Sequence, residues 1–503
     1  MAPIIAISVA ITLADRVKHI LVCRREGICS VETEGSVFGP VDPVQRHVAH
    51  YHVNGFRSLQ NFSVCLKPGL NVLLGANGSG KTNFLDFLDF ITNLVVSNCA
   101  TAVSEAGGVA RVFSQEVLKR KIPRVTAKII GLADLEPFIP GSIRRRFFKF
   151  EYEVDIRYSK FHTAIYIANE KVKFKNLHSN ESNLDAETTV GSVEIHRKSP
   201  LSDDEPRWSV GNYLYASSPR NPMRFVHAHR IPLRSKKDTP PGEHRVQLLT
   251  QAPAAAPDES ILNTRLAFPA LDAVRAALSR GRSFNLNPQK ARAPDDISRA
   301  PLIQADGSGL SATIYQMQQA KKSDERQVVL RRRFRQDALD TIVGWTQLVI
   351  PELQDITATA DPHTGKYQVY LHVGGENTSL KISLQSASDG TLKWLAFACL
   401  AISPGVEYTF EEPENYLHPK MQQYFISLLR DSIDLDASFP KRFIISTHSE
   451  TIINQCKPEE LLLFHFIDGA TRCRHIQNVE AVMKQVNETG FGLGHYYAHN
   501  TLR

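Results

Sequence analysis

The fold is decided by the stretch Gly75-Ala76-Asn77-Gly78-Ser79-Gly80-Lys81-Thr82. It satisfies the pattern GxxxxGK[ST], in which glycines let successive backbone N–H groups point inward and cradle phosphate oxygens. An apolar, strand-like run at residues 70–74 leads into the stretch, and from Asn83 onward apolar residues recur at helical spacing. The sequence therefore predicts a strand, a glycine-rich loop and a helix whose positive dipole end faces a bound phosphate.

The loop residues have expected partners on a nucleotide. Lys81 would reach the β and γ phosphates, and the Thr82 hydroxyl would ligate Mg²⁺. The alternative is a glycine-rich turn that matches by chance, but the flanking strand and helix argue against it. We therefore expect ATP and Mg²⁺ as cofactors. The predicted nucleotide-binding residues are Gly75, Ala76, Asn77, Gly78, Ser79, Gly80, Lys81, Thr82 and Asn83.

Strand-like segments surround the loop in the first half of the chain. A two-residue period at 51–74, with apolar segments on both sides of Lys67-Pro68-Gly69, predicts a hairpin whose second strand is 70–74. Residues 147–156 and 162–167 are rich in β-formers and predict an antiparallel sheet layered on this half.

A second cluster is Tyr408-Thr409-Phe410-Glu411-Glu412-Pro413-Glu414, an apolar strand that ends in adjacent carboxylates. Adjacent residues of a strand point to opposite sides. One carboxylate can therefore hold the water shell of Mg²⁺ while the other orients the attacking water, as phosphoryl transfer requires. We assign Glu411 to the metal and Glu412 to the water. The alternative interpretation is a solvated acidic turn.

Two further clusters lie in the last third of the chain. Ser446-Thr447-His448-Ser449 follows the strand-like run 443–445, so His448 would project from a strand end and could hydrogen-bond a γ phosphate. It could equally be a structural histidine. Ser388-Asp389-Gly390-Thr391-Leu392-Lys393 opens a helix whose free N–H groups could bind phosphate, although any well-capped helix has this pattern.

In this order the four clusters resemble the ABC-type ATPase head of the RecF, SMC and OLD lineage, most closely at GANGSGKTN, SDGTLK, FEEPENYLHP and STHS. The resemblance, from about residue 51 to 463, implies a Walker A loop at 75–82, a signature at 388–393, a Walker B pair at Glu411 and Glu412, a D-loop region at 414–418 and a switch histidine at His448. It also implies that the signature of one protomer, with Ser388, Asp389 and Gly390, completes the ATP site of another, so that ATP joins two heads. The signature has Ser-Asp-Gly where transporters carry Ser-Gly-Gly.

The family's Q-loop glutamine, a further metal ligand, is marked by no motif here, and Gln115 is the candidate. The catalytic residues implied by the resemblance are Lys81, Glu412 and His448.

The predicted fold class is α/β, an ABC-type P-loop ATPase head with a mixed sheet and an antiparallel β layer, split by a mostly helical insertion. Helical patterning at 260–280 and 325–348 indicates the insertion. In the last third we expect helices near 391–402 and 420–433, and strands near 406–410 and 442–446. Four parts follow. They are an N-terminal extension at 1–48, the half with Walker A and the β layer at 49–230, the loop and helical insertion at 231–375, and the half with signature, Walker B and switch histidine at 376–503.

The composition of the chain limits the classes of protein to which it can belong. Lys and Arg exceed Asp and Glu by 7 in 503 residues, which permits an anionic partner but is far from a histone-like tail. The 7 cysteines include no CxxC pair, which indicates a reducing compartment. No apolar run approaches the roughly 18 residues of a membrane span. The apolar stretch at 2–14 lacks the features of a signal peptide. We expect a cytoplasmic protein without a membrane partner.

Several members of the lineage do not fit. The segment between Lys81 and Ser388 is too long for a transporter subunit and lacks the heptad repeats of SMC arms. The segment after His448 is too short for the Toprim nuclease of OLD proteins, and no HNH or PD-(D/E)xK pattern stands out. We therefore predict an ATPase without a built-in nuclease.

With these members set aside, the chain resembles the stand-alone ATPases of anti-phage systems such as Septu and PARIS. The hypothesis is that the protein forms a homodimer or higher oligomer and regulates a separately encoded effector, such as a nuclease, through its nucleotide state. The alternative is a RecF-like DNA-binding ATPase of repair or fork maintenance, with Arg144-Arg145-Arg146 and Arg331-Arg332-Arg333 plus Arg335 on phosphates. These clusters could also be solvated faces. A scaffold that binds ATP without turnover is a third interpretation.

Overall fold

The computed structural model describes residues 49–134, 147–175, 192–198, 211–217, 245–248, 257–263, 269–279, 283–322, 334–375, 380–403, 407–435, 441–499 and 501. The chain divides into two compact units, Met1–Gly39 and Pro40–Arg503, and the described residues all belong to the second. The predicted N-terminal extension at 1–48 lies outside them.

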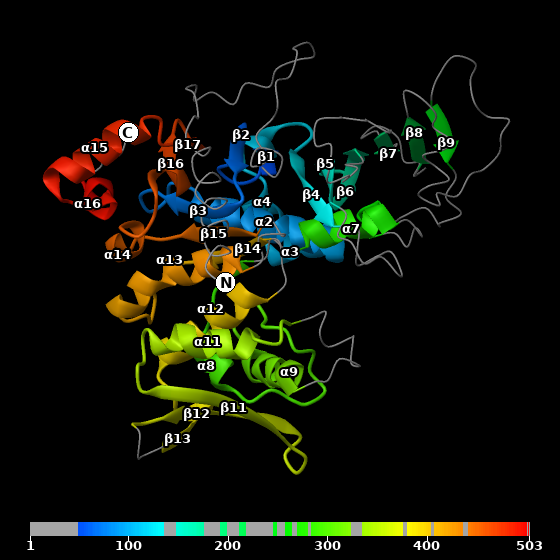
Figure 1. The fold of residues 1–503 in the computed structure, drawn as a ribbon. Coiled ribbons are helices and arrows are strands. Elements are labelled where there is room, and N and C mark those ends of the chain that lie inside the picture. The colour runs from blue at the N-terminus through cyan, green and yellow to red at the C-terminus, as the bar shows by residue number, and fades with distance from the viewer. Residues whose placement is uncertain are drawn as a thin grey trace, which may run out of the picture. The chain divides into compact units, whose positions relative to one another are not determined.

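A six-stranded sheet in the order β10-β14-β15-β3-β16-β17 carries the predicted motifs (Figure 1). Its strands are β3 (Gly69–Leu74), β10 (Ser283–Phe284), β14 (Glu407–Glu411), β15 (Arg442–Ser446), β16 (Leu461–Ile467) and β17 (Ala470–His475). All neighbours are parallel except β16 and β17, so the sheet is mixed. Parallel strands end at one edge of a sheet. The residues that follow β3, β14 and β15 therefore lie together at that edge.

An eight-stranded antiparallel sheet in the order β2-β1-β4-β5-β6-β7-β8-β9 forms a second layer. Its strands are β1 (Ala49–Asn54), β2 (Phe62–Leu66), β4 (Arg124–Asp134), β5 (Phe147–Ser159), β6 (Ala164–Lys175), β7 (Ser192–Lys198), β8 (Gly211–Ser217) and β9 (Arg245–Leu248). The predicted α/β class with a mixed sheet and an antiparallel layer is confirmed.

The predicted hairpin around Lys67-Pro68-Gly69 is wrong. Strand β2 stays in the antiparallel sheet with β1, whereas β3 enters the six-stranded sheet between β15 and β16. The physical reason is burial on both faces: the side chains of β3 from Leu70 to Leu74 are all buried, as in a central parallel strand. Gly69, at φ +88°, allows the sharp change of direction. The Asn71 side chain holds the corner, since its Oδ1 accepts from Lys67 N at 2.9 Å.

Helix α2 (Lys81–Val96) lies between the two sheets. Its buried residues pack with the antiparallel strands and with Leu73 and Ile444 of the six-stranded sheet. The neighbouring residues Val72 and Ile445 belong to a second core on the opposite face of that sheet. Alternate residues of each strand therefore serve different cores. Helices α3 (Cys99–Glu105) and α7 (Pro269–Leu278) pack on α2, and α7 also packs on β4. Helix α4 (Val109–Val112) packs on α3, and α5 (Gln115–Lys119) follows it in the chain.

The second core is built on α12 (Asp389–Ile402) and α13 (Pro419–Asp434), close to the predicted 391–402 and 420–433. The strands expected near 406–410 and 442–446 are β14 and β15. The C-terminal part adds α14 (Glu450–Ile453), η4 (Pro458–Glu460), α15 (Val479–Thr489) and α16 (Leu493–Ala498). Helix α16 packs on α14, which follows β15 directly.

The prediction of a mostly helical insertion is incomplete. Its described helices are α7, α8 (Pro288–Arg292), α9 (Leu310–Lys322) and α11 (Ala338–Gln347). The same region begins an antiparallel sheet of β11 (Leu353–Asp361), β12 (Lys366–Val373) and β13 (Leu380–Ser383), which is followed by η3 (Leu384–Ser386). Helices α9 and α11 pack on β11 (Figure 1). This sheet was not predicted, because the clearest periodicity in the region is the helical one of the segments that precede it. Buried residues do alternate along β12, as expected for a strand with one buried face.

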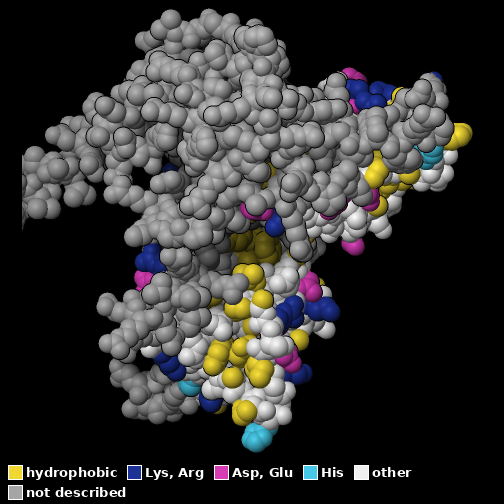
Figure 2. All heavy atoms as spheres, turned by 90° about the vertical axis from the view of Figure 1, so that its right-hand side faces the viewer, with side chains coloured by type: hydrophobic (Ala, Val, Ile, Leu, Met, Phe, Trp, Pro, Cys, Tyr) yellow, Lys and Arg dark blue, Asp and Glu magenta, His cyan; other side chains and the backbone are white. Residues whose placement is uncertain are grey.

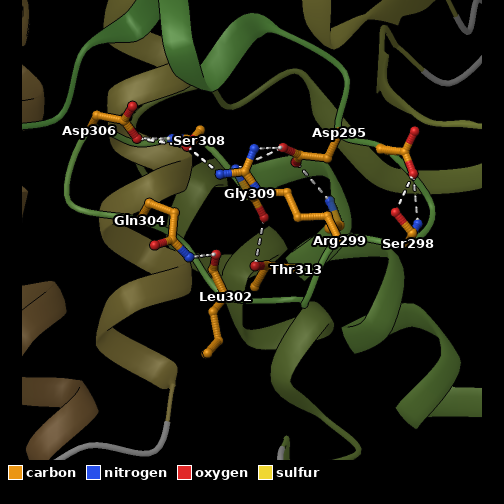
Figure 3. A network of polar contacts seen from close by, with 11 residues as sticks. Asp295, Ser298, Arg299, Leu302, Gln304, Asp306, Ser308, Gly309 and Thr313 are labelled. Carbon is orange, nitrogen blue, oxygen red and sulfur yellow. Dashed lines mark hydrogen bonds and ion pairs between the residues drawn. The ribbon is translucent and has the colours of Figure 1, made fainter. Parts of the chain in front are cut away.

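A polar network shapes the loop before α9 (Figure 3). The buried Asp295 carboxylate accepts hydrogen bonds from Gly309 N at 2.9 Å and Ala312 N at 3.1 Å. The Arg299 guanidinium links this carboxylate to the Ser308 hydroxyl. Asp295 thus satisfies amides at the start of α9 and holds the whole loop in place.

Charged side chains of both signs are scattered, with hydrophobic ones between them, over the described part of the face in Figure 2. The predicted basic clusters at 144–146 and 331–333 lie outside the described residues. Arg335 is described, and its guanidinium contacts Asp337 Oδ2 at 2.8 Å and Leu435 O at 2.7 Å. No helix among the described residues is long and apolar enough to cross a membrane.

Candidate nucleotide-binding site

The loop 75–82 connects β3 to α2 through backbone conformations that require glycine. Gly78 and Gly80 have φ of +79° and +98°. A Cβ on Gly80 would lie 1.9 Å from Thr471 Oγ1, and one on Gly75 would lie 2.4 Å from Phe464 O. Residues of strands β16 and β17 therefore contact the loop directly. Only glycine fits at positions 75 and 80, and the amides at the start of α2 can bind an anion.

The Lys81 side chain lies inside the loop. It is only 7% exposed, and its Nζ donates to Gly75 O at 2.6 Å and Ala76 O at 3.3 Å. Burial lowers the pKa of Lys81, an effect that the nearby carboxylates Glu412 and Glu411 oppose. Among the described residues, the acceptors of this ammonium are backbone carbonyls, and phosphate oxygens would be stronger acceptors.

Thr82 and Glu411 come together from α2 and β14. The Thr82 hydroxyl donates to Glu411 Oε1 at 3.1 Å. Burial raises the pKa of Glu411, and Asp86 and Glu412 add to this rise. A hydroxyl and a carboxylate are oxygen donors of the type that Mg²⁺ prefers, and Mg²⁺ takes most remaining ligands from water and phosphate. The described residues contain no group of three or more His, Cys, Asp or Glu that could hold a metal.

Glu412 leaves the strand in a left-handed conformation, at φ +43°. Its N–H still donates to Ser446 O at 2.9 Å, and its Oε2 accepts from Asn415 Nδ2 at 3.1 Å. The different directions of Glu411 and Glu412 therefore come from this turn as well as from strand alternation, on which the sequence-based assignment relied. Backbone strain of this kind in a non-glycine residue is concentrated at functional sites.

His448 follows β15 and is positioned by Glu414, the first residue of the predicted D-loop region. Glu414 accepts from the His448 backbone N at 2.8 Å and from Thr447 Oγ1 at 2.9 Å. Burial, aided by Lys81, lowers the pKa of His448, and Glu412 and Glu414 oppose this. The sequence placed Glu414 in the predicted D-loop region but did not connect it with the segment that carries His448.

One cavity gathers the predicted residues from three separate segments of the chain. The residues that line it are Asn77, Gly78, Ser79, Gly80, Lys81, Thr82, Asn83, Glu412, Ser446 and His448. The Ser79 hydroxyl is buried and has no hydrogen-bond partner among the described residues. A buried, unpartnered hydroxyl beside the amides of a phosphate-type loop fits an oxygen-rich ligand such as a triphosphate.

The predicted signature residues Ser388, Asp389 and Gly390 do not line this cavity. Ser388 caps α12 by accepting from Thr391 N, and Asp389 pairs with Arg292 at 2.7 Å. Gln115 also lies outside the cavity lining and is exposed at the start of α5.

A series of hydrogen-bonded polar side chains connects the start of α2 to Ser58 and to β17. Asn83 Nδ2 donates to Ser58 Oγ at 2.7 Å, and Ser58 Oγ lies 2.7 Å from Thr471 Oγ1. Arg57 pairs with Asp86 of α2 and donates to Ala106 O. The sequence motifs assigned no role to Arg57, Ser58 or Thr471. Arg57 and Ser58 follow the first strand, but Thr471 lies too far along the chain for a local pattern to indicate it.

Lys393 links α12 to the turn that carries Glu412. Its side chain is 2% exposed, and its Nζ donates to Asn415 O at 2.9 Å and Glu412 O at 3.4 Å. Burial lowers the pKa of Lys393 to about 8. The unfolded chain, with a lysine pKa near 10.5, binds more protons than the folded chain between these values. Stability therefore rises with pH in this window.

We expect this rise to disappear in Lys393→Met. The free energy of unfolding of the wild type, relative to the variant, should increase by about 2 kcal/mol between pH 8 and pH 10. Urea unfolding of both proteins across this pH range measures the difference. Groups that titrate equally in both proteins do not contribute to it. A difference that is independent of pH would contradict a Lys393 that loses its proton in the folded protein.

Two family models match the chain. Residues 49–197 match the "AAA ATPase domain", and residues 254–454 match "AAA domain, putative AbiEii toxin, Type IV TA system". The first segment contains Lys81 and the second contains Glu412 and His448. The chain is similar to AAA ATPase domains in both segments.

Three curated relatives are "DNA replication and repair protein RecF". The RecF of Nocardioides sp. is 31% identical over 91 residues, which are 18% of this chain and 21% of the relative. That of Renibacterium salmoninarum is 37% identical over 65 residues, 13% and 15% of the two chains. That of Frankia alni is 29% identical over 99 residues, 20% and 25%. The chain spans a quarter or less of the length of these relatives. Together with the domain models, these similarities support an ATPase.

Among solved structures, an SMC head bound to the C-terminal winged-helix domain of ScpA has a TM-score of 0.42 and 13% identity, covering 85% of this chain and 97% of its own. An SMC head with an extended coiled coil, bound to the C-terminal domain of ScpA derived from Pyrococcus furiosus, has a TM-score of 0.40 and 13% identity, covering 88% and 100%. Both likenesses are distant.

Proposed function

We propose that the protein hydrolyses ATP, with Mg²⁺, at a site that a second copy of the chain completes, as in ABC-type heads of the RecF, SMC and OLD lineage. The observation that carries this proposal is the cavity that joins Lys81, Glu412 and His448 at the ends of β3, β14 and β15. These segments are distant in sequence, and each contributes a different group that phosphoryl transfer needs.

Each side chain has a role that its surroundings favour. Lys81 and the amides of the loop bind the phosphates, and Thr82 and Glu411 hold Mg²⁺, which offsets negative charge on the phosphates when bound. Glu412, oriented by Asn415, accepts a proton from the attacking water. His448 faces the same cavity and contacts the γ phosphate. Catalysis by positioned charges and a general base is the usual means of phosphoryl transfer. Gln115, the proposed Q-loop glutamine, is exposed and would add a further oxygen ligand to Mg²⁺.

The second copy is inferred from the signature residues. Ser388 is exposed, and Asp389 is fixed by Arg292. Gly390 allows close packing, because a Cβ there would lie 2.8 Å from Tyr416 O. The loop is thus preorganised at the start of a 14-residue helix but lies outside the cavity of its own chain. A nucleotide between two copies would meet both surfaces.

Mixing two inactive variants tests the shared site. Lys81→Ala removes the phosphate-binding ammonium, and Ser388→Arg blocks the signature, so neither homodimer should hydrolyse ATP. In an equal mixture, half of the dimers combine the two variants, and each contains one intact site. Activity should recover to about a quarter of the wild-type value. Steady-state phosphate release measures it. Recovery should fail in a mixture of Lys81→Ala with Lys81→Met, and failure in the first mixture would contradict a shared site.

The biological role that we propose is control of a separately encoded effector, such as a nuclease, in anti-phage defence. Support comes from the resemblance to Septu and PARIS ATPases and from the AbiEii description of the model that matches residues 254–454. Binding and hydrolysis of ATP would shift the population of effector-holding and effector-releasing states.

Purification of the tagged protein from its host, with ATP and Mg²⁺, tests this role. A near-stoichiometric effector encoded nearby supports it. Copurified DNA without an effector favours the RecF-like alternative, which rests on the similarity to RecF. In that case DNA affinity should fall steeply with salt, because bound phosphates release counterions.

A further inference from the structure

The C-terminal helix α16 packs closely onto the segment that carries His448. A Cβ on Gly494 would lie 2.8 Å from Glu450 Cα, so only glycine permits this approach of α16 to α14. The Gly494 N–H also donates to Asn454 Oδ1 at 2.7 Å. Because α14 begins two residues after His448, a residue on α16 is held in a defined position relative to the histidine.

Tyr497 of α16 joins the Walker A loop to His448 through its hydroxyl. The hydroxyl donates to Gly75 O at 3.0 Å and accepts from Gly75 N at 3.2 Å. It also lies 3.4 Å from His448 Nδ1. The loop after β3 and the segment after β15 therefore meet at the hydroxyl of one α16 residue.

The hydrogen count of this hydroxyl favours one tautomer of the histidine. A phenol has a single hydrogen, and the Tyr497 hydroxyl lies closer to Gly75 O, which can only accept, than to His448 Nδ1, so we assign this hydrogen to the bond with Gly75 O. The contact with His448 then requires that Nδ1 carries a hydrogen and donates it. In the neutral ring, Nε2 is left as the acceptor. Burial raises the pKa of Tyr497, which keeps the hydroxyl protonated for this role.

Gly75 O has a second donor, since Lys81 Nζ lies 2.6 Å from it. A Lys81 ammonium that turns to a phosphate would leave this carbonyl, and the Tyr497 hydroxyl would remain as its donor. The same hydroxyl thus supports the loop during nucleotide binding and orients the histidine.

We propose that Tyr497 is a positioning residue of the ATPase site, which holds His448 in the Nδ1–H tautomer and aims Nε2 at the γ-phosphate position. The inference rests on the proposed ATPase function. The charged and titratable groups that face the imidazole are Lys81 of α2, Glu412 and Glu414 after β14, and Tyr497 itself.

The first readout is independent of ATP turnover. Protein labelled with ¹⁵N in its histidine rings is compared at a pH where His448 is neutral, and His448→Gln identifies its signals among the 18 histidines. The wild type should show a protonated Nδ1 and an unprotonated Nε2, and Tyr497→Phe should show a mixture of tautomers. An Nε2–H tautomer in the wild type, or the same tautomer in both proteins, would overturn the proposal.

The second readout is hydrolysis. Tyr497→Phe keeps the ring but removes the hydroxyl, and kcat should fall about tenfold with little change in ATP affinity, as for other groups that orient an active side chain. The dependence of kcat on pH should also change. Tyr496→Phe is the matched control, because the Tyr496 hydroxyl bonds to Thr489 and Gln485 O, away from the loop. Equal kcat and pH profiles for Tyr497→Phe and wild type would contradict the role. If the wild type does not hydrolyse ATP but has the expected tautomer, the proposed function fails while the positioning of His448 stands.

Discussion

Replacing Glu412 by glutamine is expected to lower the rate constant of ATP hydrolysis by about 10²–10⁴-fold, while ATP affinity stays within a few-fold. Glutamine keeps the shape of the side chain and can still accept the hydrogen bond from Asn415 Nδ2. It cannot take a proton from the attacking water. Single-turnover hydrolysis of ATP, together with a binding titration, separates the lost chemistry from binding.

Two further variants serve as controls for Glu412→Gln. Glu480→Gln removes an exposed carboxylate from the first turn of α15 and should hydrolyse ATP at the wild-type rate. Glu411→Gln should change the Mg²⁺ concentration needed for half-maximal activity, because Glu411 approaches the Thr82 hydroxyl. A Glu412→Gln protein that turns over ATP like the wild type would remove Glu412 from the proposed mechanism.

The same variant also tests whether ATP joins two copies. A protein that binds ATP but cannot hydrolyse it should accumulate as the ATP-bound dimer or higher oligomer, by the reciprocity of binding and association. Light scattering after gel filtration, with and without ATP, measures the mass. An identical mass in both conditions would contradict ATP-dependent association.

Local sequence patterns were sufficient where a motif and its secondary structure are contiguous. The glycine-rich loop, the apolar strand that ends at Glu411 and the strand before His448 each contain their own signal within ten residues or so. Parallel pairing then brings the three together, as the register of Glu411 with Ser446 and of Ser446 with Leu73 shows. The edge of the sheet could therefore be predicted from the sequence.

Features that depend on partners far along the chain could not be predicted. The segment around Gly69 has the pattern of a hairpin, but the side chains of β3 find buried surroundings on both faces, which no local window contains. Thr471 lies against Gly80, and Tyr497 lies against Gly75, across nearly the whole chain. The turn at Glu412 was also missed, because proline and glutamate after a strand do not specify φ +43°.

Gly80→Ala is expected to have the largest effect on the structure of the site. A Cβ at this position would lie 1.9 Å from Thr471 Oγ1 and 2.8 Å from Thr471 Cγ2, and φ is +98°. Left-handed strain costs about 1–2 kcal/mol for a residue with a Cβ, and an overpacked core costs about 1–3 kcal/mol more. Stability should therefore fall by roughly 2–5 kcal/mol, and ATP binding should be lost as α2 moves away from β17.

Gly78→Ala is the matched control, since φ is +79° but no atom of the described residues lies within 4 Å of a Cβ at this position. This variant should have the backbone strain without the steric clash, so its free energy of unfolding, measured with urea, should fall by about 1–2 kcal/mol. The double variant Gly80→Ala, Thr471→Ala removes the two closest atoms and should recover part of the difference between the two single variants. Equal losses of stability for Gly80→Ala and Gly78→Ala would show that Thr471 does not restrain the loop. A larger loss for Gly80→Ala, partly reversed by Thr471→Ala, would show that the last strand of the sheet sets the position of the phosphate-binding loop, and hence that the segment after His448 belongs to the nucleotide site.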